Sequence, residues 1–136
     1  MIRIATYGTF RKGEVRERFM DELRESGRSK EMTLNGVKML DLGPYPGAVF
    51  TDDENDEIVV ELLEAEFSKK KEEDLLKQFD AIEGVAFGLY DRNSIRTPWG
   101  KAVIYTICDP DRYEDAPVIR DWKDRKALPN CMKQGK

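Results

Sequence analysis

The stretch that decides the fold is IRIATYGTFRKG, residues 2–13. Residues 2–7 are rich in apolar and β-branched side chains and predict a short strand that ends at Gly8. A loop between Gly8 and Gly13 follows, and residues 14–26 then place three apolar side chains at the fourfold spacing of an amphipathic helix, namely Val15, Phe19 and Leu23. We therefore expect a strand, a glycine-bracketed loop and a helix in direct succession.

The rest of the chain alternates predicted strands with a second helix. Extended segments are expected over residues 32–42, 48–50 and 57–67, with a rigid connection rich in glycine and proline over residues 42–47. Ser68 offers an N-cap for a helix over residues 69–82, and Gly84 stands where the glycine that ends such a helix is expected. Residues 89–97 and 101–108 predict a hairpin. This order predicts an α+β domain with a mainly antiparallel or mixed sheet, and periodicity leaves open whether that sheet closes into a small barrel.

The composition indicates a single, densely charged domain. Its 136 residues suit one hydrophobic core, and 23 Lys plus Arg against 27 Asp plus Glu leave a net charge of −4. We expect no nucleic-acid partner, although the net charge of the whole chain does not exclude a local basic patch at residues 69–71. No apolar run reaches the roughly 18 residues of a membrane span, and the first residues turn polar too soon for a secretory signal. A cytoplasmic protein without a membrane partner is expected.

The two cysteines have neither CxxC spacing nor the density of a disulfide framework. Cys108 is expected to be a buried core thiol, and Cys131 a free thiol of the polar C-terminal segment. The chain also contains no histidine, which excludes Ser-His-Asp and Cys-His nucleophile pairs and histidine metal sites. A proton transfer at neutral pH must therefore use a carboxylate, lysine, tyrosine or thiol with a shifted pKa.

Three short constellations are candidates for chemistry. The loop of residues 7–13 can present successive backbone N–H groups to a carboxylate or phosphate, although an ordinary strand-to-helix connection has the same composition. Glu83 follows the second helix between apolar residues, where its pKa is expected to be raised; alternatively it faces solvent beside a capping glycine. Tyr90 and Arg92, with Tyr105 on the next strand, suit a small ligand that carries a carboxylate, or else form a core tyrosine beside a surface arginine.

Together these motifs carry a resemblance. Five of them occur in order: residues 7–13 (YGTFRKG), 42–47 (LGPYPG), 79–84 (FDAIEG), 89–92 (LYDR) and 121–122 (DW). The set resembles the signature of the γ-glutamylcyclotransferase-like superfamily, in particular the small bacterial and γ-glutamylamine cyclotransferase type. The resemblance covers residues 1–122 and predicts one domain there, with a polar C-terminal tail over residues 123–136.

The resemblance implies an α+β fold built on a small mixed β-barrel with flanking helices. It also implies an enzyme, without metal or cofactor, that cyclises a small-molecule γ-glutamyl amine or peptide to 5-oxoproline and releases the amine. Glu83 would be the general base and then the general acid, and the backbone of Gly8, Thr9 and Phe10 would bind the substrate's α-carboxylate. Tyr7, Tyr90 and Tyr105 would also line the substrate site.

A second hypothesis stands beside the enzyme. The same fold and cavity could serve a non-catalytic domain that binds a small ligand or a protein, because fold does not fix function. A third and weaker hypothesis is a nucleic-acid-associated protein that uses residues 69–71. The sequence also departs from the family pattern at Thr9 and Phe10 in the loop and at Arg120 before the late aspartate.

Overall fold

The computed structural model describes residues 1–125 of the chain. Its elements in order are β1 (Ile2–Thr6), η1 (Glu17–Met20), α1 (Asp21–Ser26), β2 (Arg28–Asn35), β3 (Val37–Asp41), β4 (Pro46–Phe50), β5 (Glu57–Ala65), α2 (Lys69–Ile82), η2 (Val85–Phe87), β6 (Tyr90–Thr97), β7 (Gly100–Ile107), η3 (Pro110–Tyr113), β8 (Val118–Ile119) and η4 (Trp122–Asp124). Cys131 and most of the predicted tail, residues 126–136, lie outside the described residues. The domain boundary at residue 122 stays a prediction.

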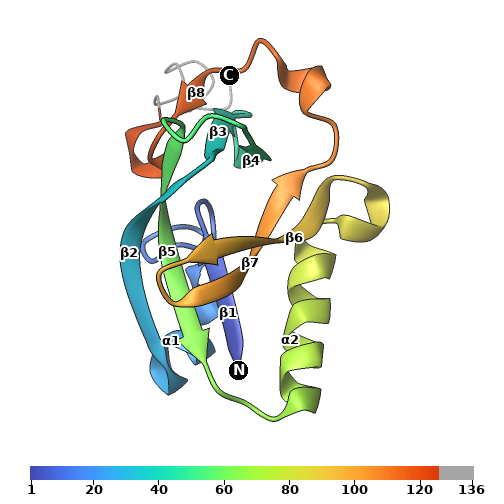
Figure 1. Cartoon of the computed structure of the whole chain (residues 1–136). Coiled ribbons are helices and arrows are strands. Elements are labelled where there is room, and N and C mark those ends of the chain that lie inside the picture. Colours follow the sequence, from blue (N-terminus) through green and yellow to red (C-terminus); the bar gives the residue numbers. More distant parts are fainter. Residues whose placement is uncertain (126–136) are drawn as a thin grey trace.

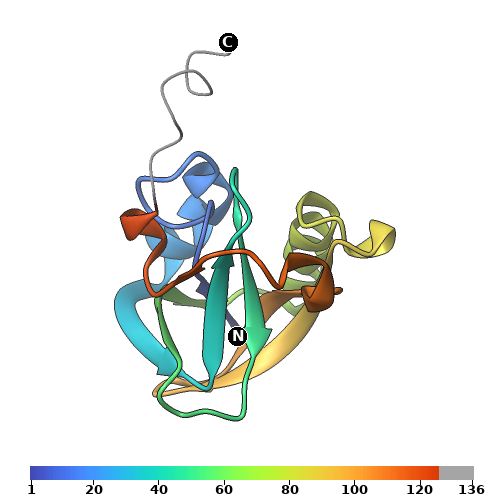
Figure 2. The ribbon, with the colours of Figure 1, turned by 90° about the horizontal axis from the view of Figure 1, so that it is seen from above.

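One mixed sheet carries the eight strands of residues 1–125, in the order β2-β5-β1-β7-β4-β3-β8 with β6 paired to β7. β1 is antiparallel to β5 but parallel to β7, where Ile4 pairs with Val103. The sheet curls, so that the N–H of Val59 in β5 donates to the carbonyl oxygen of Arg120, just beyond β8, at 2.8 Å. Figure 2 shows the strands wrapping around a common interior with α2 outside. The expected α+β fold on a small mixed barrel is confirmed as a curled half-barrel with two helices.

The second helix has the bounds that its sequence predicts. The Ser68 hydroxyl accepts a hydrogen bond from the N–H of Lys71 at 3.2 Å, as an N-cap does. Leu75 and Phe79 bury the apolar face of α2 against the sheet, beside the β6–β7 hairpin in Figure 1. The helix ends at Ile82 with Glu83 as its C-cap, because Gly84 adopts the left-handed conformation with φ of +67°.

The predicted helix over residues 14–26 is wrong in its first half. The chain there forms turns, in which Glu14 N–H donates to Arg11 O at 2.9 Å and Arg16 N–H donates to Thr9 O at 2.8 Å. Val15 is therefore 82% exposed instead of packing on the core. Only the later apolar residues are covered: Leu23 is fully buried in α1, and Phe19 packs partly buried on the core.

The interior holds two clusters of buried side chains. One lies between the sheet and the helices and contains Phe79, whereas the other is built from strand residues together with Tyr7 and Trp122. Cys108 is half-buried and not in the core, because β7 ends at Ile107 and Cys108 already belongs to the following connection. Within residues 1–125, no helix combines the length and apolar character needed to cross a lipid bilayer.

Candidate active site

A cavity of about 110 Å³ opens where β1 runs into the following loop. Its wall contains every residue that the family resemblance assigns to the site, namely Tyr7, Gly8, Thr9, Phe10, Glu83, Tyr90 and Tyr105. The wall also contains Arg16, which lies in none of the quoted motifs, and Tyr45, Pro46 and Leu89, which lie in quoted motifs but are not assigned to the site. Residues that are far apart in the chain thus meet at one place.

The loop that lines this cavity has unpaired backbone donors. Its turn is closed by the N–H of Arg11, which donates to Gly8 O at 3.0 Å. No hydrogen bond among residues 1–125 uses the N–H of Gly8, Thr9 or Phe10 as donor. Three successive free N–H groups on a cavity wall form a favourable place for a carboxylate.

Gly8 is required by the close packing of the loop. A Cβ added at this position would lie 2.6 Å from Cγ of Pro46, which itself lines the cavity. Pro46 is the first residue of β4, so its ring cannot move without the strand. Any larger residue at position 8 would therefore displace the loop or narrow the cavity.

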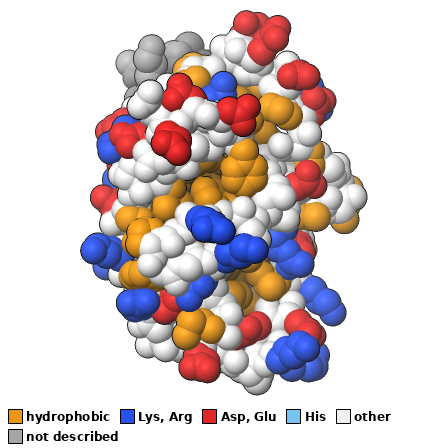
Figure 3. Space-filling model, in the orientation of Figure 1, with side chains coloured by type: hydrophobic (Ala, Val, Ile, Leu, Met, Phe, Trp, Pro, Cys, Tyr) orange, Lys and Arg blue, Asp and Glu red, His pale blue; other side chains and the backbone are white. Residues whose placement is uncertain are grey.

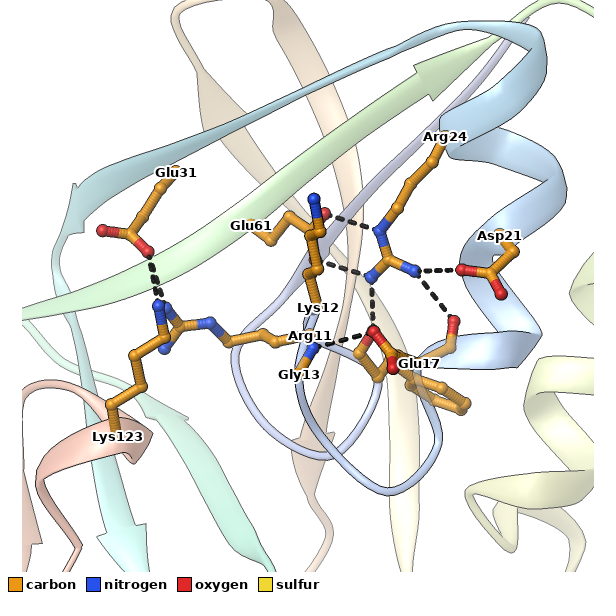
Figure 4. A network of polar contacts seen from close by, with 10 residues as sticks. Arg11, Lys12, Gly13, Glu17, Asp21, Arg24, Glu31, Glu61 and Lys123 are labelled. Carbon is orange, nitrogen blue, oxygen red and sulfur yellow. Dashed lines mark hydrogen bonds and ion pairs between the residues drawn. The ribbon is translucent and has the colours of Figure 1, made fainter.

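A buried polar network holds the loop from behind (Figure 4). The Arg24 guanidinium makes a bidentate pair with Glu61, at 2.7 and 2.8 Å, and also donates to the carbonyl oxygen of Phe10 at 2.8 Å. Glu61 accepts a further hydrogen bond from the N–H of Lys12 at 2.8 Å. Burial acts to raise the pKa of Glu61, but the hydrogen bonds from Arg24 and Lys12 outweigh it and the pKa is lowered. Glu61 is therefore held ionised, as the anchor of the loop.

Arg11 ties the same loop to the C-terminal part of the domain. It is only 2% exposed and donates to Asp121 at 2.7 Å and to Glu31 at 2.9 Å. Asp121 also accepts from the N–H of Lys123, and the neighbouring Trp122 is buried in the core. The early and late motifs of the sequence thus meet in one structural contact behind the cavity.

Glu83 lies on the cavity wall at the C-terminal end of α2. Its N–H donates to Phe79 O at 2.9 Å, which fixes the backbone of the residue. Burial raises the pKa of Glu83 to about 7, and the charge of Arg16 acts in the opposite direction. A carboxyl group with this pKa can both accept and return a proton near neutral pH.

The turn after Glu83 offers a test of how its position is held. We expect Gly84→Ala to lower the free energy of unfolding by about 1–2 kcal/mol because of the left-handed backbone alone. A further loss is expected because the new Cβ would lie 2.7 Å from Leu89. Gly88→Ala is the matched control, since Gly88 has φ of +70° but nothing within 4 Å of the added Cβ. Urea unfolding should show the larger loss for Gly84→Ala; equal losses would mean that the Leu89 contact is unimportant.

The three tyrosines shape the cavity, but their hydroxyl groups are engaged elsewhere. Tyr7 donates to the carbonyl oxygen of Tyr105 at 2.5 Å and accepts from the N–H of Ala48, and Tyr90 donates to Pro46 O at 2.6 Å. The hydroxyl of Tyr105 donates to Asp80 at 2.7 Å. Burial raises the pKa of all three well above the usual phenol value. They stay protonated, which leaves Glu83 as the titratable group of the cavity wall near pH 7.

Of the two interpretations of Tyr90 and Arg92, the surface arginine is the one that the structure has. Arg92 does not line the cavity; it pairs with Asp80 at 3.2 Å on the surface. The guanidinium of the cavity belongs instead to Arg16. The one sequence feature that could have indicated Arg16 is its position three residues after Gly13. The predicted continuous helix over residues 14–26 instead assigns Arg16 to the charged, solvent-facing side of that helix.

The rim of the cavity is apolar. Tyr45 is 39% and Leu89 is 53% exposed, and both line the cavity. On the face in Figure 3, apolar side chains gather in the middle and are bordered by Lys and Arg side chains over the β6–β7 hairpin. Among residues 1–125, no group of three or more Cys, Asp or Glu side chains is arranged to hold a metal ion.

Comparison with known proteins places these features in a family. The family model described as gamma-glutamyl cyclotransferase, AIG2-like, matches residues 4–124. Comparison with curated protein sequences gives no match.

Solved structures share the fold. An AIG2-like protein of Mus musculus has a TM-score of 0.67 at 16% identity, covering 96% of this chain and 91% of that one. An uncharacterised protein of Pyrococcus horikoshii has a TM-score of 0.64 at 21% identity, covering 91% and 92%. Protein ytfP from Escherichia coli has a TM-score of 0.58 at 21% identity, covering 89% and 94%. With the family model matched over nearly all of the described residues, the chain belongs to the AIG2-like γ-glutamyl cyclotransferase family.

Proposed function

We propose that this protein converts a γ-glutamyl amine or peptide to 5-oxoproline and a free amine, with Glu83 as general base and general acid. The observation that carries the proposal is the presence, on one cavity wall, of a carboxyl group with a pKa of about 7 and of three free backbone N–H groups. Family membership supports a cyclotransferase, and the substrate and mechanism are the proposed part.

The substrate is bound through its α-carboxylate. The N–H groups of Gly8, Thr9 and Phe10 receive this carboxylate, and the rings of Tyr7, Tyr90 and Tyr105 enclose the methylene chain. This places the α-amine beside Glu83 and folds the chain so that the amine approaches its own γ-carbonyl carbon. Orientation for such an intramolecular reaction supplies several of the roughly 7–11 kcal/mol available from proximity.

One carboxyl group, that of Glu83, is enough for all the proton transfers of this reaction. Ionised Glu83 takes a proton from the α-ammonium, and the free amine attacks the γ-carbonyl carbon to form the new C–N bond. Glu83 returns the proton to the scissile nitrogen as the old C–N bond breaks. After the attack, Glu83 moves a second proton from the attacking nitrogen to the nitrogen of the released amine. The products are therefore the lactam with one N–H and the released amine as its ammonium ion, and Glu83 is again ionised.

The test is release of 5-oxoproline from a panel of γ-glutamyl amino acids and γ-glutamyl amines. We expect turnover of at least one member by the wild-type protein and turnover by Glu83→Gln that is slower by about 10²-fold or more. Turnover of no member, or full activity in Glu83→Gln, would contradict the proposal. Calorimetric binding of a γ-glutamyl compound without product would instead favour the non-catalytic binding domain. The cytoplasmic location and the absence of nucleic-acid and membrane partners stay predictions.

A further inference from the structure

We propose that Arg16 binds the carboxylate of the leaving amino acid, so that the preferred substrates are γ-glutamyl α-amino acids and not γ-glutamyl amines that lack this carboxylate. The proposal rests on the cyclisation described above and names its substrate class. It also assigns a specificity role to a residue outside the predicted site.

The chemistry of the substrate requires two anion receptors near Glu83. Glu83 must reach two nitrogens, the α-amine that attacks and the scissile nitrogen that leaves. In a γ-glutamyl α-amino acid, each of these nitrogens is bonded to a carbon that carries a carboxylate. Both carboxylates therefore lie close to the carboxyl group of Glu83, whereas a γ-glutamyl amine has only the first of them.

The cavity wall holds two such receptors. The first is the set of free N–H groups at Gly8, Thr9 and Phe10, and the second is the guanidinium of Arg16. Arg16 is the one Lys or Arg on the part of the wall that the structure describes. It lines the same cavity as Glu83 and Tyr90, and its charge acts to lower the pKa of both groups.

Arg16 is held in place without using its side chain. Its backbone N–H donates to Thr9 O at 2.8 Å, and its carbonyl oxygen accepts from the N–H of Phe19 at 3.1 Å. Within residues 1–125 its guanidinium makes no ion pair, whereas Arg11, Arg24 and Arg92 each pair with a carboxylate. A guanidinium on a largely apolar wall loses hydrogen bonds to water. A bound carboxylate replaces them with charge-assisted hydrogen bonds.

The apolar rim fits the same class of leaving group. Tyr45 and Leu89 are exposed at the cavity and offer contact for the side chain of an amino acid whose carboxylate is held by Arg16. Arginine suits this role because its planar fork can bind a carboxylate through two hydrogen bonds.

The test compares two substrates that differ by one carboxylate. γ-L-Glutamyl-L-alanine and γ-L-glutamylethylamide have the same leaving-group skeleton except for this group, and kcat/KM for 5-oxoproline release is measured for both. We expect the wild-type protein to prefer the alanine compound. Arg16→Gln should lower the ratio of the two kcat/KM values by about 10- to 100-fold, the usual range for a lost charge-assisted hydrogen bond. Arg16→Lys keeps the charge but loses the planar pair of donors, so its ratio should lie between that of the wild-type protein and that of Arg16→Gln.

Arg18→Gln is the matched control. It removes the same charge two residues away, from an exposed side chain that stacks on Phe19 and does not line the cavity. The ratio should stay within about twofold of wild type for this variant, since a distant surface charge is screened. An equal loss on both substrates in Arg16→Gln would overturn the proposal, because it would assign Arg16 to the α-carboxylate or the reacting carbonyl. An unchanged ratio would overturn it as well.

Failure of the proposal and failure of the proposed function give different results. Turnover by the wild-type protein with an unchanged ratio in Arg16→Gln would remove only the role of Arg16. If the wild-type protein turns over neither compound, calorimetry with both compounds separates recognition from chemistry. Tighter binding of the alanine compound that Arg16→Gln removes and Arg18→Gln keeps would support the carboxylate site. Equal weakening for both compounds in Arg16→Gln, or binding of neither compound to any of the proteins, would overturn it.

Discussion

Glu83→Gln should lower kcat for 5-oxoproline release by about 10²–10⁴-fold, the usual contribution of a positioned general acid or base. Glutamine keeps the size of the side chain but neither accepts nor returns a proton. KM should change little, because the substrate's α-carboxylate is bound by the loop of residues 8–10 and not by Glu83. The measurement is steady-state kinetics on any substrate that the wild-type protein turns over; a loss confined to KM would contradict the acid–base role.

The same substitution should stabilise the protein at alkaline pH. Folding raises the pKa of Glu83 from 4.5 to about 7, so between these values the folded state binds more protons than the unfolded state. Stability therefore falls as the pH rises through this range, and Gln avoids the loss. We expect a higher Tm than wild type at about pH 8 and no difference near pH 4.

Glu73→Gln, on the exposed face of α2, is the control for that measurement. It should leave Tm nearly unchanged at both pH values, because surface substitutions have small effects. A stability gain of Glu83→Gln that is the same at both pH values would mean that burial of the carboxylate is not its cause.

Arg24→Met should lower the free energy of unfolding by about 3 kcal/mol, the cost of leaving a buried carboxylate without its partner. The Glu61 side chain is 9% exposed and would keep only the hydrogen bond from the N–H of Lys12 and the nearby charge of Arg11. Phe10 O would also lose its donor, so the loop should be held less firmly and KM should rise.

The stability difference between the wild-type protein and Arg24→Met should depend on pH in a defined direction. The pKa of Glu61 is lowered on folding, so its contribution to stability is present above its ordinary pKa of 4.5 and is lost as the pH falls through the lowered value. The difference between wild type and Arg24→Met should therefore shrink in acid. Arg120→Met is the control, because its pair with Glu57 is exposed and is expected to contribute less than about 1 kcal/mol. Equal losses in urea unfolding for the two variants would contradict the anchoring role of Arg24.

Local patterns predict the second helix and the last hairpin well. Ser68, Leu75, Phe79 and Gly84 carry a cap, an apolar face and a left-handed stop within the helix itself, so no distant contact is needed to define it. The pairing of β6 with β7 likewise depends on one tight turn. The parallel pairing of β1 with β7, in contrast, joins residues about 100 positions apart, and no local pattern specifies it.

The candidate site was predictable only where a residue carries its own signal. Glu83 is marked by a helix end between apolar residues, and Gly8 by the end of a strand. Arg16 has no such mark, because its orientation depends on the hydrogen bond from its N–H to Thr9 O, which folds the chain back after the loop. Arg92 has the expected strand position but is drawn to Asp80, whose place depends on how α2 packs.

The central claim is that the carboxyl group of Glu83 moves the proton, and the pH dependence of kcat/KM tests it most directly. The chain has no histidine, and burial raises the pKa of Tyr7, Tyr90 and Tyr105 well above the usual phenol value, so a limb near pH 7 belongs to Glu83 or to the substrate. The substrate's ammonium group titrates well above this range, which separates the two. We predict that kcat/KM for 5-oxoproline release rises with pH through about 7, as Glu83 ionises, and that this limb is absent from the residual activity of Glu83→Gln. A profile that is flat across this range, or an identical limb in Glu83→Gln, would contradict the claim.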